Sequence, residues 1–143
     1  KTSPSAFVCS RQNLPVLSGP LKGDVENGGY LLSEAANATV TLIASGSEVS
    51  LALETAKELA ARGVMTNVVS VPCYDLLIEQ SQSYIDSIIK PDTKKIAIEA
   101  ARGLEWYRFA DTVIGMDTFG ASAPADQLFK QFGFTAEAII ARI

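Results

Sequence analysis

The sequence predicts an α/β fold with three α/β/α layers, in which helices cover both faces of a mostly parallel mixed sheet of about five strands with one antiparallel edge strand. The main observation is an alternation along the chain between β-branched apolar runs, such as 38–44, and segments with helical periodicity, such as 49–60. The second observation is size, since 143 residues, 48% of them hydrophobic, can bury a core without disulfides or a structural metal. We therefore expect one compact layered domain over most of the chain.

The order of the elements follows from the apolar runs and the turn residues between them. The expected strands cover residues 6–9, 30–33, 38–44, 64–71, 94–100 and 112–116. The expected helices and helical turns cover residues 48–62, 74–90 as one or two helices, 106–110, 124–132 and 135–143. The strand at 30–33 is the expected antiparallel edge, because the strands after it alternate with helices and therefore run parallel.

The helix after strand 38–44 has signals at both ends. Its apolar residues, from Val49 to Ala60, fall on one face of a 3.6-residue period. Ser45 and Glu48 have the spacing of a capping box, and Gly63 stands where a glycine in the left-handed conformation commonly ends a helix. This helix is therefore expected to begin and end within a residue or two of these signals. The last helix has Thr135 as its expected N-cap.

Composition excludes several classes of function. A net charge of −4 argues against nucleic acid as a partner, because no broad basic field is available. No apolar run is long enough for a membrane span, and residues 1–10 lack the order of a signal peptide, so a soluble protein without a membrane partner is expected. Histidine is absent, which removes Ser-His-Asp, Cys-His and HExxH chemistry. Because Lys1 rather than Met opens the sequence, we expect the chain to be a piece of a longer protein.

The two cysteines, Cys9 and Cys73, have no metal-ligand or CxxC spacing. Both lie in or next to apolar runs, so we expect free thiols that are buried or half-buried.

Two segments at strand ends could bind an anion. Ser45-Gly46-Ser47 joins a buried strand to a helix N-terminus, where free N–H groups favour an anion, but it lacks both glycine-rich phosphate patterns, and simple helix capping is the alternative. Arg11, in the polar run after the first strand, could hold a phosphate with its guanidinium or form a surface salt bridge. The spacing of the residues does not decide between these readings.

Two further segments are candidates with a structural alternative. Asp117 to Pro124 leaves a strand and enters a helix with Pro in the first turn, which favours a structural use. Glu99 ends a strand near Arg102 and Trp106, and is either a carboxylate in a crevice or an ordinary ion-pair partner. Residue chemistry alone therefore predicts an α/β domain without self-contained catalytic machinery.

Six segments resemble, in order and spacing, the C-terminal end of transketolases. They are Ser10-Arg11-Gln12-Asn13-Leu14-Pro15, Gly28-Gly29-Tyr30, Ile43 to Val49, Val69-Ser70-Val71-Pro72, Phe119 to Ala125, and Phe132-Gly133-Phe134-Thr135. The resemblance implies a homodimeric parent enzyme of the pentose phosphate pathway, with thiamine diphosphate and a divalent metal, magnesium or calcium, as cofactors. Such an enzyme is a transferase that moves a two-carbon ketol unit from a ketose phosphate to an aldose phosphate. A cytoplasmic location is implied, or a plastid if the source is a photosynthetic eukaryote.

The resemblance also implies how the chain is divided and which residue binds substrate. Residues 1–17 would end a pyrimidine-binding domain, 18–29 would form a linker, and 30–143 would form the C-terminal domain. Arg11 matches the arginine of the family's Ser-Arg-Gln motif, which binds the substrate phosphate. The family's Gly-Asp-Gly motif, catalytic histidines and cofactor-activating glutamate have no counterpart in this sequence, so the isolated chain is expected to be inactive and to bind neither cofactor.

The role of this last domain has two readings, a buttress of the dimer or a regulatory site near Ser45-Gly46-Ser47. Two other assignments compete with a transketolase. One is a free-standing α/β binding or interaction module. The other is the C-terminal domain of a related thiamine-diphosphate enzyme, either 1-deoxyxylulose-5-phosphate synthase or the second subunit of a 2-oxoacid dehydrogenase. The Ser-Arg-Gln-Asn and Phe-Gly-Ala-Ser-Ala-Pro segments favour transketolase over these relatives.

Overall fold

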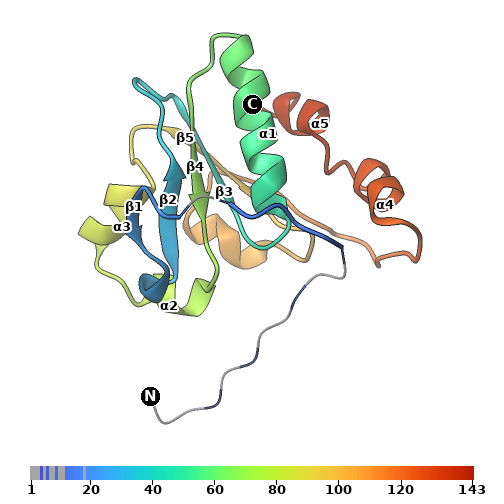
Figure 1. Cartoon of the computed structure of the whole chain (residues 1–143), viewed down its shortest axis with the longest axis horizontal. Coiled ribbons are helices and arrows are strands. Elements are labelled where there is room, and N and C mark those ends of the chain that lie inside the picture. Colours follow the sequence, from blue (N-terminus) through green and yellow to red (C-terminus); the bar gives the residue numbers. More distant parts are fainter. Residues whose placement is uncertain (1–3, 5, 7–8, 10–11, 18) are drawn as a thin grey trace.

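A six-stranded sheet forms the centre of the molecule, and helices cover both of its faces (Figure 1). The computed structural model describes residues 4, 6, 9, 12–17 and 19–143. The strand order is β1-β2-β4-β3-β5-β6. The strands are β1 (Lys22–Asp24), β2 (Gly29–Ser33), β3 (Val40–Ala44), β4 (Thr66–Ser70), β5 (Lys94–Ile98) and β6 (Thr112–Ile114).

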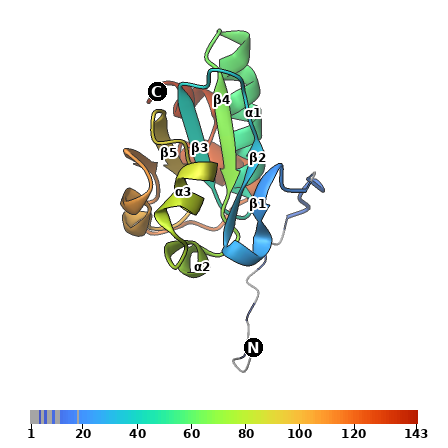
Figure 2. The ribbon, with the colours of Figure 1, turned by 90° about the vertical axis from the view of Figure 1, so that its left-hand side faces the viewer.

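Helices on the two faces of the sheet complete three layers (Figures 1 and 2). One face carries α1 (Glu48–Ala61), α4 (Ala125–Gln131) and α5 (Ala136–Ile140), and the other carries α2 (Tyr74–Ile78), α3 (Gln82–Ile88) and the 3-10 helix η2 (Leu104–Arg108). A further 3-10 turn, η1 (Val25–Asn27), joins β1 to β2. None of the helices in the described part of the chain has the length and apolarity needed to cross a bilayer.

The strands supply the two halves of the core through the period-2 alternation of their side chains. In β3, Leu42 packs under α1 and α5, whereas the next residue, Ile43, packs under α2 and α3; neither side chain has measurable exposure. Val68 and Val69 divide in the same way in β4. Because both faces are covered, these strands read as continuous apolar runs, as expected for buried parallel strands.

The predicted fold class is confirmed, with one strand more than the sequence indicated. β3, β4, β5 and β6 are parallel, and β2 is antiparallel to β4. Beyond β2 lies β1, which comes from the segment interpreted as a linker and pairs antiparallel with β2. The three residues of β1 are all exposed, so no apolar pattern in the sequence predicts this strand. It is a strand because its backbone pairs with the edge of β2.

The predicted helix boundaries are largely confirmed, but the predicted capping box is wrong. Ser47, not Ser45, precedes α1, and no side-chain hydrogen bond caps the helix. The Ser45 hydroxyl donates to Glu99. Gly63 has a φ of +80° and follows α1 as predicted. Thr135 caps α5 as predicted, accepting a hydrogen bond from the backbone N–H of Ala138.

The N-terminal predictions are only partly tested. Cys73 is half-buried as expected, but Cys9 is exposed, so its predicted burial is wrong. Most of the expected first strand, including Phe7 and Val8, and the candidate Arg11 lie outside the described residues.

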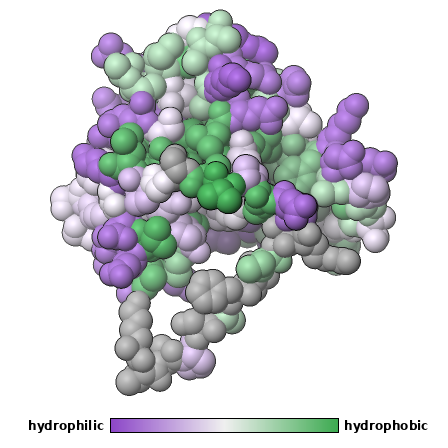
Figure 3. All heavy atoms as spheres, in the orientation of Figure 1, coloured by the Kyte–Doolittle hydropathy of each residue, from purple (hydrophilic) through white to green (hydrophobic). Residues whose placement is uncertain are grey.

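On the face seen in Figure 1, apolar atoms gather in the middle and polar atoms surround them (Figure 3). Leu17, half-buried, packs against the core on the α1 side of the sheet, whereas Val16 is fully exposed.

Candidate functional site

The most structured polar site lies at the carboxyl ends of β3 and β5, where the topology of the sheet reverses. The chain leaves β3 toward α1 on one face of the sheet and leaves β5 toward η2 on the other face, so the two connections diverge at the carboxyl ends of these neighbouring strands. In open α/β sheets such a divergence opens the crevice where ligands commonly bind. We call this point of divergence the crevice; Ser45-Gly46-Ser47 follows β3 there, and Glu99 and Ala100 follow β5.

Glu99 connects three separate segments within this crevice. One of its carboxylate oxygens, Oε2, accepts hydrogen bonds from the Ser45 hydroxyl at 2.9 Å and from the Trp106 indole N–H at 3.2 Å. Trp106 is only 3% exposed, so the indole fixes the carboxylate from the core side. No ion pair to Arg102 forms between the described residues. Of the two sequence interpretations, the ion pair is not found in the described part of the chain, and Glu99 instead accepts hydrogen bonds from two neutral donors where the connections diverge.

Glu48 adds a second, more deeply buried carboxyl to the same crevice. It lies in the first turn of α1, is 4% exposed and accepts a hydrogen bond from the Ser47 hydroxyl at 2.6 Å. Burial raises its pKa, the hydrogen bond from Ser47 opposes this shift, and the nearby charge of Glu99 raises the pKa further. Glu48 therefore retains a proton more readily than an ordinary glutamate does.

Sequence reasoning found Ser45 and Glu99 as candidates but gave Glu48 only a capping role. Glu48 and Glu99 are far apart in the chain, and the parallel pairing of β3 with β5 brings their loops together. One signal in the sequence could have indicated that the two carboxyls lie close together: both residues follow strands of the same expected parallel sheet, and no basic residue lies beside Glu48. Since Ser45-Gly46-Ser47 faces these carboxyls, its chemistry in this structure is that of a hydrogen-bond donor to carboxylates.

A wider hollow opens beside this crevice, beyond the ends of β5 and β6. It has a volume of about 660 Å³. It is lined by Ala100, Ala101, Arg102, Met116, Asp117, Thr118, Phe119 and Gly120. Phe119 is 98% exposed, and every residue from Asp117 to Gln127 is exposed. The segment 117–124 therefore presents its side chains to the surface, and it contributes no convergent polar site.

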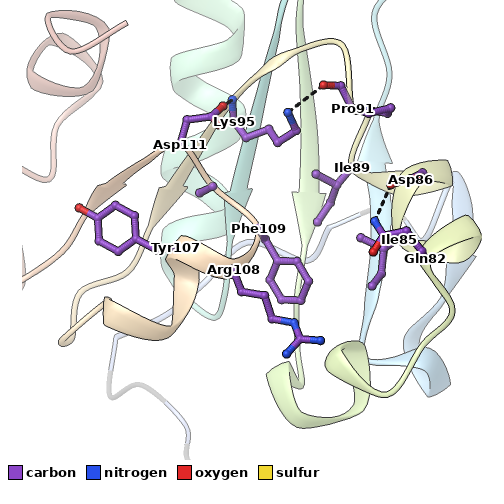
Figure 4. Close-up of a pocket in the computed structure, with 11 residues that line it drawn as sticks. Gln82, Ile85, Asp86, Ile89, Pro91, Lys95, Tyr107, Arg108, Phe109 and Asp111 are labelled. Atoms are coloured by element: carbon purple, nitrogen blue, oxygen red, sulfur yellow. Dashed lines mark hydrogen bonds between the residues drawn. The ribbon is translucent and has the colours of Figure 1, made fainter.

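A second hollow, of about 340 Å³, lies at the opposite, amino ends of β5 and β6 (Figure 4). Three of its charged side chains, those of Asp86, Lys95 and Asp111, already form hydrogen bonds within the protein. The Lys95 ammonium donates to the backbone carbonyls of Pro91 and Thr93, both at 2.9 Å, and Asp111 accepts from the Lys95 backbone N–H at 2.8 Å. The Arg108 guanidinium turns away from Lys95 and Asp111 (Figure 4). This hollow therefore offers few free polar groups to a ligand.

Comparison with known proteins decides the family. The profile of the transketolase-like TK C-terminal domain matches residues 28–135. Over 147 aligned residues, which cover 98% of this chain, the sequence is 44% identical to transketolase 1 of Vibrio vulnificus strain YJ016. The chain belongs to the transketolase family. It is also 40% identical to the chloroplastic transketolase of Solanum tuberosum and 39% identical to transketolase 1 of Saccharomyces cerevisiae.

Solved structures agree with this transketolase assignment. The crystal structure of transketolase from Campylobacter jejuni superposes with a TM-score of 0.87 at 42% identity, over 92% of this chain and 21% of that one. A split-gene transketolase, described as an inactive beta4 tetramer, shares the fold at 19% identity and a TM-score of 0.70. The chain spans 22% of the Vibrio relative and 20% of the potato relative, about a fifth of a transketolase.

The residues of this chain do not fit the metal and cofactor that the family implies. The chain has no histidine. Within its described residues, no three acidic or cysteine side chains gather as a metal site would require. The carboxyl pair in the crevice is already bound to Ser45, Ser47 and Trp106. The described residues therefore support no catalytic step through a metal or thiamine diphosphate.

Proposed function

We propose that this chain is the C-terminal part of a thiamine-diphosphate-dependent transketolase that transfers a two-carbon ketol unit from a ketose phosphate to an aldose phosphate. The observation behind the proposal is the 44% identity to a transketolase over 98% of the chain. Thiamine diphosphate and a divalent metal would bind to the rest of the parent enzyme, a homodimer in the cytoplasm or in a plastid. This chain would then contribute structure and binding contacts to the parent enzyme, and no residue that takes part in bond making or breaking.

The proposed domain division places the end of a pyrimidine-binding domain at 1–17, a linker at 18–29 and the C-terminal domain at 30–143. The start of the family profile at residue 28 supports the second boundary. The pairing of Lys22, Gly23 and Asp24 with β2 attaches part of the linker to the sheet. In the parent, this attachment would fix where the connection enters the C-terminal domain.

Arg11 is the proposed substrate-binding residue, through a bidentate contact between its guanidinium and the substrate phosphate. Such a contact holds substrate and transition state alike, so its loss raises KM more than it lowers kcat. In the parent enzyme, Arg11→Ala is the variant that tests this role, with Arg62→Ala as a control. Arg62 lies at the exposed end of α1, where it pairs with Glu58 at 3.8 Å. An unchanged KM for Arg11→Ala would remove Arg11 from the site.

The domain itself has two proposed roles in the parent, as a buttress of the dimer or as a regulatory site at the crevice. Deletion of residues 30–143 from the parent separates them. Loss of the dimer supports the buttress, whereas a dimer that keeps basal activity but no longer responds to effectors supports regulation. A dimer with unchanged activity and regulation would contradict both.

Three measurements test the function itself. The first is the intact mass, in source cells, of the polypeptide that carries this segment, which we expect to be several times 15.2 kDa. The second is ketol transfer from a ketose phosphate, which we expect in the parent and not in the isolated chain. Titration of the isolated chain with thiamine diphosphate should give no heat of binding. A native product near 15.2 kDa would favour a binding module or a subunit of a related enzyme.

A further inference from the structure

The surface around edge strand β6 exposes large apolar side chains that a free-standing domain normally buries. Phe119 is 98% exposed, Leu104 is 60% exposed and Tyr107 is 58% exposed. Leu104 and Tyr107 belong to η2, directly before β6, and Phe119 follows β6 in the loop toward α4. Because contiguous exposed apolar surface marks contact sites, this clustering around one edge strand needs a partner.

The loop after β6 is exposed, but its lack of charge and its free backbone groups are typical of a segment that a partner covers. Thr118 to Pro124 contains no charged residue, whereas surface loops are commonly polar and charged. Between the residues that the structure describes, no hydrogen bond involves a backbone group of 117–123. A run of small side chains with free N–H and C=O groups can pair with another segment of backbone.

Three hollows line this loop and share residues, so they form one continuous surface. The largest, of about 660 Å³, is next to Phe119 and shares Asp117 with a hollow of about 150 Å³ beside Leu104 and Tyr107. It shares Ala100, Met116 and Gly120 with a third hollow of about 200 Å³. The third is the most apolar and is lined by side chains of α4 and the turn after it, namely Leu128, Phe129, Phe132 and Phe134.

We propose that this surface, which we call the β6 face, is covered by the part of the parent polypeptide that precedes this chain. The inference rests on the proposed function, in which this chain is the C-terminal fifth of a longer protein, as in relatives of which it spans 22%. The remaining four-fifths of such a protein are the occupant, and the contact would be an apolar pocket for Phe119 beside backbone that pairs with 117–123.

A second copy of this chain is the competing occupant, and the size of the face argues against it. A stable interface between separate proteins uses about 20 to 30 residues from each partner, which the residues that line the three hollows approach but do not exceed. A tethered partner needs less area, because a short linker gives an effective concentration of the order of millimolar.

Hydrogen exchange of the full-length parent protein, followed by mass spectrometry, tests the β6 face. We expect the amides of 117–123 to exchange at least ~100-fold more slowly than in a synthetic peptide of residues 115–125. The reason is that the contact would cover and hydrogen-bond backbone N–H groups that have no partner among the described residues of the isolated chain. The exposed turn at residues 36–37 in the same protein serves as an internal reference. Exchange at the rate of the peptide would overturn the inference, and slow exchange that disappears on 100-fold dilution (about the range needed to dissociate a second copy) would replace it with contact between copies.

Phe119→Ala in the full-length protein tests the anchor. We expect the exchange of 117–123 to become at least ~10-fold faster, because an aromatic anchor holds the loop in its pocket. The matched control is Val25→Ala, which truncates another exposed apolar residue, 49% exposed, at the opposite edge of the sheet, and should leave 117–123 unchanged. Equal effects of the two variants would contradict an anchor at Phe119.

Ketol transfer measured on the same preparation separates this inference from the proposed function. An active full-length enzyme with fast exchange at 117–123 would overturn the β6 face alone. A long polypeptide with slow exchange but no ketol transfer would overturn the enzymatic assignment alone. A native product near 15.2 kDa would overturn both.

Discussion

The crevice at the carboxyl ends of β3 and β5 and the hollow at the amino ends of β5 and β6 both contain charged residues, but they use them differently. In the crevice, Glu48 and Glu99 come from loops that diverge to opposite faces of the sheet, and only neutral groups bind them. In the hollow, the Lys95 ammonium donates to backbone carbonyls of the turn before β5, and Asp111, just before β6, accepts from the Lys95 backbone N–H in the neighbouring strand β5. The comparison teaches that divergent connections bring distant side chains together, whereas the charged groups at the amino ends form hydrogen bonds with nearby backbone groups.

The largest expected effect is on the crevice side, at Trp106. Trp106→Ala in the isolated chain should lower the free energy of unfolding by about 3–5 kcal/mol, because a buried aromatic side chain leaves a cavity. The change also removes the indole donor to Glu99 and an edge contact with Tyr74, whose ring centroid lies 5.6 Å away. Urea denaturation monitored by far-UV circular dichroism measures it. Tyr107→Ala, at a residue 58% exposed, is the neighbouring control and should cost less than about 0.5 kcal/mol.

A smaller effect is expected for Ser45→Ala, which leaves the Glu99 carboxylate with the indole as its donor. Hydrogen bonds to charged groups contribute about 1.5–3 kcal/mol, so a loss near the lower value is expected for this half-buried pair. Ser122→Ala, in an exposed loop, should change nothing in the same urea titration. If the two serine variants are equally stable, the link between Ser45 and Glu99 does not hold the crevice together.

The corresponding change in the amino-end hollow is Asp111→Ala. It removes an acceptor for the Lys95 backbone N–H and should cost about 0.5–1.5 kcal/mol, because that N–H then depends on water. Asp92→Ala, another exposed aspartate next to β5, is the control for loss of charge alone. A cost for Asp111→Ala larger than that of Ser45→Ala would reverse the comparison between the two regions.

Local signals in the sequence were enough to predict most of the fold. Gly63 and Thr135 act within a few residues of themselves, and the apolar period of 49–60 depends on one helix, so each could be recognised without knowing the tertiary structure. β1 could not, because Lys22, Gly23 and Asp24 are all exposed and become a strand only by pairing with β2.

The candidate site was predicted less completely for the same physical reason. Ser45 and Glu48 match a capping box, but the Ser45 hydroxyl is directed toward Glu99, 54 residues away, and caps no backbone N–H of α1. Such competition between a local and a distant partner depends on strand order, which the sequence pattern leaves open. Arg11, inferred from a motif, lies outside the described residues and stays a prediction.

The smallest expected effect concerns the pH dependence of stability and is specific to the crevice. The pKa of Glu48 is raised in the folded protein, chiefly by burial, above its ordinary value of 4.5. The folded state therefore binds this proton more tightly than the unfolded state, and stability from this group is present below the unfolded pKa and is lost as pH rises through the folded pKa. Glu48→Gln should remove that loss, so the variant should gain stability relative to the wild type as pH rises from about 4 to about 7.

The measurement is the free energy of unfolding from urea titrations at several pH values across that range. Glu54→Gln, at an exposed position on α1, is the matched control and should follow the wild-type curve. Glu99→Gln should act in the same direction as Glu48→Gln, because removing the neighbouring charge lowers the pKa of Glu48. Parallel curves for Glu48→Gln and the wild type would show that neither burial nor the Glu99 charge raises the pKa of Glu48 in the folded protein, and the difference between the two ends of the sheet would then be one of hydrogen bonding alone.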